Sequence, residues 1–466
     1  MGKRYTEREV EQIVADAVQP LLQRIVQLEA KLAQYETDSS NSSKPPSSDI
    51  VKPPPKPEPK SRKKRKRGGQ VGHRKFQRQP FPAEQVDRTY TYELEDTTGL
   101  QPLSGTDGWR IVQQVELPAR FWHVTEHRAR RYRCRRTGRI VTAPLPRDVT
   151  RGGLMGPRLT TLACYLKGVC HSSYRTVQRF FREVMELDLS TGLLAKATRR
   201  MTAALSEPYE QLRAALPRQP ALGIDETGLR HAGRGHWVWC THAPGEDGLT
   251  VYAIDPSRGS GVLERMLGPD YTGTITCDYF SAYRKYLADS DAVTMQFCWA
   301  HLVREVKFMA GLPDKVTANF GGRLLKLIRQ LFALIHRRDR MTPAGHTRAL
   351  HRLRQRIVAL IRRAPPRDEP RKLKQRFRAH GDAYFTFIDH GGIEPTNNAT
   401  ERQIRFVVLD RKVTQGTKGL IGNQWCQRIW STIATCRQRG RPIFAFLLEA
   451  LHAQLHDRPP PSLVEV

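Results

Sequence analysis

Three acidic residues of this 466-residue chain have the type and the placement to bind a divalent metal ion. Asp225 closes the apolar run ALGID and Asp278 closes the apolar run TGTITCD, so each is expected at the end of a buried strand. Glu401, in NNATERQIR, is expected on a helix that begins near residues 396–397. Strand ends hold carboxylate oxygens rigidly, and Mg²⁺ prefers such oxygens as ligands. Together the three acids predict a metal site for phosphoryl transfer.

Each of these residues also has a plain structural interpretation. Acidic residues commonly follow strands, and Glu401 shares a helix face with Arg405, so the two could form an exposed i,i+4 ion pair. Cys298 and His301, in CWAH, follow an apolar run, but one Cys and one His make only half of a zinc site. Asn398 could be no more than a residue at the start of the helix.

Five short apolar runs must position Asp225 and Asp278. The expected strands are 221–225, 236–242, 249–255, 272–278 and 292–297, with helices at about 260–267 and 281–287. Three consecutive strands, then a helix and further strands, is the order of a ribonuclease-H-like mixed sheet in the α/β class. We assign 216–310 to the first part of this core and 391–458 to its last part, which carries the third acid.

The segment between these two parts, 311–390, is predicted to be a basic helical insertion. Between Arg323 and Arg378 it has eighteen Lys or Arg residues and only three acidic residues, and its aliphatic residues provide a buried side. This composition favours helices with a cationic face over disorder.

The charge of the whole chain limits its partners. It has 77 Lys and Arg residues against 46 Asp and Glu, a formal net charge of +31. Nucleic acid is the first candidate for a polyanionic partner, and an anionic membrane surface is the second. No apolar run approaches the roughly 18–20 residues of a spanning helix, and the N-terminus lacks the apolar core of a signal peptide. The eight cysteines show no paired spacing, which fits a reducing, cytoplasmic compartment.

The N-terminal region is predicted to associate with other copies and to bind phosphates. Residues 1–38 carry heptads, which predict either a coiled coil or one amphipathic helix packed on its own body. Residues 39–85 form a Ser/Pro-rich linker and a basic arm, in which DNA contact and a solvated charge run are the alternatives. The arm residues expected to contact DNA are Lys63, Lys64, Arg65, Lys66 and Arg67.

Two further regions separate the arm from the core. Residues 86–145 are expected to form a β module, with strands at 109–117 and 120–134. In 150–215, helices at 171–187 and 189–205, the second capped by Ser190, predict a helix-turn-helix, with a pair of structural helices as the alternative. Its expected DNA-binding residues are Arg175, Lys196, Arg199 and Arg200.

From about residue 10 to residue 450 the chain resembles the insertion sequence 66 family of bacterial DDE transposases. The resemblance depends on the order of the heptad start and of NSSKPPSSD (41–49), GGQVGH (68–73), GIDET (223–227), ITCDYFSAY (275–283), CWAH (298–301) and NNATERQIR (397–405). It implies that Asp225, Asp278 and Glu401 are the catalytic triad, holding two Mg²⁺ ions or Mn²⁺ in their place. It also implies that Cys298 and His301 shape the site. From their positions beside Glu401, Arg405 is expected to support it, and Asn398 is expected either to orient it or to contact DNA.

The resemblance implies binding of double-stranded DNA at element ends and target, followed by strand cleavage and strand transfer. It also implies accessory proteins of the same element. The heptads predict a homo-oligomer, and the cysteine usage fits a cytoplasmic protein, which would be nucleoid-associated when bound. Family members usually carry two Cys-x-x-Cys pairs, but the corresponding positions here read EDTTG (95–99) and CRRTG (134–138). We therefore expect 86–145 to be a degenerate zinc-binding-like module without zinc.

Two other functions compete with this one. A catalytically inactive DNA-binding repressor or assembly subunit of the same element would have no use for all three acids. A metal-dependent nuclease on the same fold would cut without joining, whereas the helix-turn-helix and basic arm favour a protein that selects its site.

Overall fold

The computed structural model describes residues 18–19, 79–96, 98–101, 109–118, 120–290 and 292–464. Apart from residues 18–19, the predicted coiled coil lies outside these residues, as do most of the linker and the basic arm with Lys63, Lys64, Arg65, Lys66 and Arg67. The chain divides into two compact units, Pro55–His127 and the remainder, and each is described by itself. None of the described helices combines the length and the apolar character that a bilayer-spanning segment requires.

In the smaller unit, the described residues contain one short regular element, the 3₁₀ helix η1 (Ala83–Gln85). The Gln113 side chain accepts the Phe81 N–H at 2.7 Å and donates to the Phe81 carbonyl at 3.0 Å. The prediction of a strand at 109–117 is wrong. Its apolar side chains stay in solvent, with Ile111 and Val112 both 77% exposed. Alternation stabilises a strand only where a partner strand and a core are available, and this segment has neither among the described residues.

The predicted strand 120–134 is confirmed over three residues only. In the larger unit, β1 (Arg131–Arg133) pairs antiparallel with β2 (Ile140–Thr142) in a two-stranded ribbon whose residues are all exposed. All eight cysteines are free, including Cys134 beside this ribbon.

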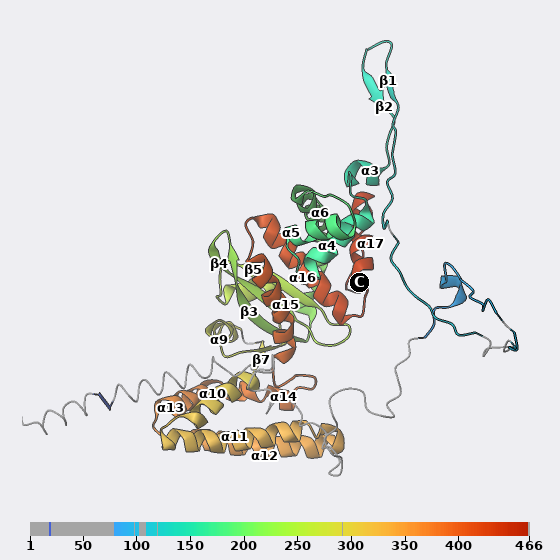
Figure 1. Cartoon of the computed structure of the whole chain (residues 1–466). Coiled ribbons are helices and arrows are strands. Elements are labelled where there is room, and N and C mark those ends of the chain that lie inside the picture. Colours follow the sequence, from blue (N-terminus) through green and yellow to red (C-terminus); the bar gives the residue numbers. More distant parts are fainter. Residues whose placement is uncertain are drawn as a thin grey trace, which may run out of the picture. The chain divides into compact units, whose positions relative to one another are not determined.

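A five-stranded mixed sheet organises the larger unit (Figure 1) and gives the chain its α/β class. Its strands are β3 (Ala221–His231), β4 (Arg234–His242), β5 (Thr250–Asp255), β6 (Thr274–Cys277) and β7 (Thr294–Phe297), in the order β5-β4-β3-β6-β7. β3, β4 and β5 are antiparallel neighbours, whereas β6 runs parallel to β3 and β7 runs parallel to β6. All five predicted strands are confirmed, because their apolar runs are long enough to be buried in the core.

Helices before, between and after the strands complete the unit. They are α3 (Arg147–Gly152), α4 (Pro157–Gly168), α5 (Tyr174–Val184), α6 (Thr191–Ala204), α7 (Ser206–Ala215), α8 (Gly261–Leu267), α9 (Ser281–Ala288), α15 (Asn398–Thr414), α16 (Leu420–Gln438) and α17 (Ile443–Leu455). The two predicted helices at 171–187 and 189–205 are confirmed as α5 and α6. Each begins at a serine, Ser173 or Ser190, whose hydroxyl accepts a backbone N–H of the first turn.

The predicted insertion is helical (Figure 1). It consists of α11 (Lys315–Ile335), α12 (Pro343–Arg362), α13 (Asp368–His380) and α14 (Thr386–Asp389), and it follows α10 (Trp299–Gly311). Buried leucines and isoleucines join α11 to α12, while the arginines stay at the surface. The helices are therefore amphipathic rather than uniformly polar.

Helix α16 covers the free edge of the sheet at β5. The backbone N–H groups of Thr250, Tyr252 and Ile254 donate to the side chains of Thr435, Ser431 and Gln427, at 3.1, 2.9 and 2.8 Å. Four helical residues rise about 6 Å and two strand residues about 6.6 Å, so the two repeats match. The helix thereby takes the place of a sixth strand and closes the edge to other chains.

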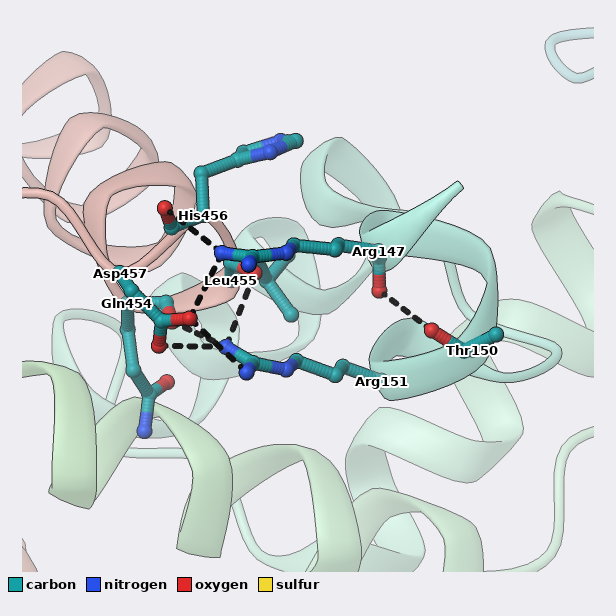
Figure 2. Close-up of polar contacts among 7 residues, drawn as sticks. All are labelled: Arg147, Thr150, Arg151, Gln454, Leu455, His456 and Asp457. Carbon is teal, nitrogen blue, oxygen red and sulfur yellow. Dashed lines mark hydrogen bonds and ion pairs between the residues drawn. The ribbon is translucent and has the colours of Figure 1, made fainter. Parts of the chain in front are cut away.

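The chain also closes on itself where α3 meets the end of α17 (Figure 2). Arg151 donates to both Asp457 carboxylate oxygens, at 2.6 and 2.9 Å, and Arg147 donates to one of them at 2.7 Å. Arg151 also donates to the carbonyls of Gln454 and Leu455 in the last turn of α17, where helix carbonyls lack the usual i+4 partners.

Candidate active site

Asp225 and Asp278 lie side by side at the junction of β3 and β6. The parallel register pairs Ala221 with Thr274 and Gly223 with Thr276. Asp225 lies two residues after Gly223, and Asp278 lies two residues after Thr276. The two aspartates are therefore level with one another, and because side chains alternate along a strand, both face the same side of the sheet. Asp278 directly follows β6, as predicted. The prediction that Asp225 ends its strand is wrong, because β3 continues to His231 through its pairing with β4.

Helix α15 brings Glu401 to the same face. The Asn397 side chain donates to the Ile224 carbonyl at 2.8 Å, which fixes the start of the helix on β3. A Cβ atom on Gly223 would lie 2.0 Å from Thr400 Oγ1 and 2.7 Å from Asn397 Oδ1. Only glycine permits this close approach, and Glu401 is the next residue after Thr400. The helix begins where the sequence predicts.

Burial raises the pKa of all three carboxyl groups, and neighbouring acids add to the shift of the two aspartates. Burial raises the pKa of Asp225 well above its usual range, with further contributions from Glu226, Glu401 and Asp278. Burial and the charge of Glu226 raise the pKa of Asp278 to about 6. Burial raises the pKa of Glu401, although Arg304 and Arg402 oppose the shift. A cluster of this kind favours either a proton or a cation.

The donor set fits a hard divalent cation. Glu401 acts electrostatically on both aspartates, but among the described residues the group of ligand atoms within 4.8 Å of one another is that of Cys298, His301 and Glu401, not that of the three acids. Glu401 Oε1 is buried without accepting a hydrogen bond from a described residue. A cation bound by the acids would reduce the repulsion among them.

Cys298 and His301 lie against Glu401 rather than apart from it. Cys298 caps the start of α10, and its sulfur accepts the Asn397 N–H at 3.2 Å. His301 Nδ1 is 3.7 Å from Glu401 Oε1, and ligand atoms of Cys298, His301 and Glu401 lie within 4.8 Å of one another. Burial raises the pKa of the Cys298 thiol to about 11 and, together with Arg304, lowers the pKa of His301 to about 4. Both side chains are therefore neutral at pH 7.

Arg304 is the cation of this group. Its guanidinium lies 3.7 Å from Glu401 Oε1 and 3.4 Å from His301 Nε2. A second positive charge between these atoms would meet repulsion from Arg304. Asn398 stands at the first position of α15, and its Oδ1 is buried without a hydrogen-bond partner among the described residues.

Comparison with known proteins places this site in a family. Residues 152–424 match the family described as Transposase IS66 family, and all three acids fall inside the match. The chain belongs to this family. Residues 3–79 separately match a family of unknown function (DUF6444).

Two proteins of Sinorhizobium fredii resemble this IS66 family member along most of its length. Uncharacterized protein y4jD is 23% identical over 354 residues, which cover 69% of this chain and 67% of the relative. Uncharacterized protein y4hP is 25% identical over 388 residues, which cover 75% of this chain and 68% of the relative.

The predicted DNA-binding residues of this IS66 family member lie apart from the acids in the sequence, on α5 and α6. Arg175 is exposed on the first turn of α5, and Lys196 and Arg199 are exposed on α6. Arg200 is half-buried, and Arg405 is exposed one turn after Glu401 on α15.

Sequence reasoning missed several residues around the acids. Glu226 is buried, with 1% of its side chain exposed, and its partners are Arg258 and Tyr283. Gly223 and Arg304 were also missed. The signal for Glu226 was available, since it stands between Asp225 and Thr227 in GIDET, but its partners are 32 and 57 residues away.

Proposed function

We propose that this IS66 family member is a DDE-type transposase, a metal-dependent polynucleotidyl transferase that binds the ends of its element, cleaves DNA strands and transfers them to target DNA. The observation that carries the proposal is the convergence of Asp225, Asp278 and Glu401 on one face of the sheet. The strand order, three antiparallel strands followed by two parallel ones, supports a ribonuclease-H-like core for this reaction.

The three acids would hold two Mg²⁺ ions, or Mn²⁺ in their place, and the bound metal supplies activation of water or of a DNA 3′-hydroxyl and stabilisation of the leaving oxygen. Asp225 is fixed by the Glu226 N–H, which donates to its Oδ1 at 3.0 Å. Asp278 accepts the Phe280 N–H at 2.9 Å. Each aspartate thereby keeps its other oxygen free for a ligand.

Glu401 is held from the other side. His301 and Arg304 stand 3.7 Å from its Oε1, and the sulfur of Cys298 receives the N–H of Asn397 at the start of the same helix. We assign these residues, with Asn398 and Arg405, to positioning Glu401. One Cys and one His make only half of a zinc site, which supports this role, and we propose no zinc in 86–145.

The DNA contacts would come from several segments. We assign α5 and α6 to a helix-turn-helix that uses Arg175, Lys196, Arg199 and Arg200, and 63–67 to a basic arm. On α12 of the insertion, Arg348, Arg352 and Arg356 are exposed at intervals of four residues, about 6 Å apart. Neither Arg352 nor Arg356 forms an ion pair with a described residue, so both are available to DNA phosphates.

The proposal extends to the assembly and its setting. Residues 1–38 would form a coiled coil that joins copies of the chain, accessory proteins of the same element would assist, and the protein would act in the cytoplasm, on the nucleoid when bound.

The test is a joining assay with the full chain, Mg²⁺, labelled element ends and a supercoiled target. We expect joined products from the wild type and none from Asp225→Asn, Asp278→Asn or Glu401→Gln, with end binding retained in a gel shift. Joining by any of the three variants would remove that residue from the triad. End binding without cleavage by the wild type would favour the repressor alternative, and cleavage without joining would favour a nuclease.

A further inference from the structure

Glu226 is a buried carboxylate that the proposed reaction does not use. It follows Asp225 on β3 and therefore faces the opposite side of the sheet, where it lies level with Trp239. Only 1% of its side chain is exposed, and burial of an unpaired charge would be costly. Its neighbours must therefore compensate for the lost hydration.

Arg258 and Tyr283 provide that compensation. Arg258, in the loop between β5 and α8, donates from Nε to Glu226 Oε1 at 2.9 Å, and its Nη2 forms an ion pair with the same oxygen at 2.7 Å. The Tyr283 hydroxyl, on α9, donates to the other oxygen, Oε2. Tyr283 is itself buried and packs edge-on against Trp239, with ring centroids 6.1 Å apart. Through Glu226, β3 is thus joined to the β5–α8 loop by Arg258 and to α9 by Tyr283.

The same group reaches Asp278 through the start of α9. Phe280 precedes the helix, and its N–H donates to Asp278 Oδ1 at 2.9 Å. The Arg258 guanidinium lies over the Phe280 ring, 3.9 Å from its centroid, and over the Trp237 ring at 4.3 Å. The Tyr283–Glu226 bond therefore fixes the first turn of α9 to β3, and Arg258 fixes the residue that holds Asp278.

We propose that Glu226, Tyr283 and Arg258 form a positioning cluster that fixes Asp278 relative to Asp225 and thereby sets how tightly the carboxylate site binds a divalent cation. This inference rests on the proposed function of that site. The positioning cluster lies behind the sheet and touches no ligand. Its members act on the reaction only through the two aspartates.

The experiment measures Mn²⁺ binding to the full chain by electron paramagnetic resonance, without DNA. Tyr283→Phe removes one hydroxyl and leaves the ring in the core, and the loss of such a supporting contact weakens metal binding about 10-fold or more. The matched control is Tyr209→Phe. Tyr209 is also buried and donates one hydrogen bond, to the Tyr252 carbonyl at 2.9 Å, but on β5, two strands away from β3.

We expect Tyr283→Phe to bind Mn²⁺ about 10-fold more weakly than the wild type, Tyr209→Phe to match the wild type, and end binding to be the same in all three. Added Mn²⁺ should restore the cleavage rate of Tyr283→Phe. Equal Mn²⁺ affinity in Tyr283→Phe and Tyr209→Phe would overturn the inference.

Two further variants keep the result interpretable. If Tyr283→Phe lacks the circular dichroism of the wild type, Arg258→Lys replaces it, since Arg258 is 38% exposed and lysine keeps the charge but not the paired donors. Unchanged Mn²⁺ affinity in Arg258→Lys would then overturn the inference. Asp225→Asn separates the two proposals: if it binds Mn²⁺ as the wild type does, the site itself is wrong and the role of the cluster fails with it.

Discussion

At the carboxylate site, three largely buried acidic side chains lie near one another. At the α3–α17 junction, by contrast, two arginines surround one exposed aspartate (Figure 2). Burial and like charges raise the pKa of Asp225 and Asp278, while the bond from Arg151 lowers the pKa of Asp457. The first arrangement costs stability until a cation binds. The second is already satisfied. The contrast separates a site prepared for a ligand from a contact that only joins two helices, and it can be tested by substitution.

The largest effect is expected from Gly223→Ala. The added methyl group would stand 2.0 Å from Thr400 Oγ1 and would push the start of α15, and Glu401 with it, away from β3. Displacement of a catalytic group by about 1 Å costs about 100-fold in rate. We therefore expect strand transfer to fall by at least about 100-fold, measured in the joining assay.

Gly228→Ala is the matched control for this prediction. Gly228 lies on the same strand, but its added Cβ would meet only Arg411 Nη1, at 4.0 Å. Its strand transfer should stay within a few-fold of the wild type. Equal activity of the two variants would mean that close approach of α15 is not required.

These residues also indicate how far the sequence could predict the site. Asp225 and Asp278 were recognisable because each closes an apolar run in the sequence, and Glu401 because it stands in the first turn of a predicted helix. The strand at 109–117 was predicted from the same kind of pattern and was wrong, because alternation does not reveal whether a partner strand exists. Gly223 and Glu226 were missed, since their importance lies in contacts with Thr400, Arg258 and Tyr283, which are far away in the sequence.

A second prediction concerns stability without metal. The pKa of Asp278 is about 6 in the folded protein, against an ordinary value of 3.8. The contribution of this carboxyl group to folding stability is therefore fully present below about pH 4 and is lost as the pH rises through 6. At pH 7.5 in EDTA, Asp278→Asn should therefore be more stable than the wild type, by on the order of 1–2 kcal/mol in urea unfolding.

The advantage of Asp278→Asn should shrink toward pH 4, where the wild-type carboxyl is protonated. Saturating Mg²⁺ should stabilise the wild type and reduce the difference, because the cation binds the folded state. A variant less stable than the wild type at pH 7.5 would contradict the view that this carboxylate costs stability.

A third, smaller effect is expected at exposed arginines of α12, which belong to neither the carboxylate site nor the α3–α17 junction. Arg352→Ala on α12 should weaken end binding a few-fold and reduce the slope of log affinity against log salt by about 1. Arg354→Ala is the control, because Arg354 pairs with Asp382 at 2.7 Å and with Asp389 at 3.7 Å. Equal salt slopes for Arg352→Ala and the wild type would exclude a phosphate contact at that position.

The smallest effect is expected at the junction, from Asp457→Asn. Asp457 is 55% exposed, and exposed ion pairs contribute little because water and salt screen them. The lowered pKa of Asp457 gives the opposite pH dependence to that of Asp278: its stabilisation is present above the ordinary pKa of 3.8 and is lost as the pH falls through the lower, folded value. Asp457→Asn should therefore be slightly less stable than the wild type at pH 7.5, and the difference should disappear in strong acid and in high salt.

Thermal unfolding of Asp278→Asn and Asp457→Asn across pH compares the carboxylate site and the junction directly. If Asp278→Asn and Asp457→Asn changed stability in the same direction at pH 7.5, the two aspartates would not differ in their effect on folding, and the contrast between the carboxylate site and the junction would be wrong.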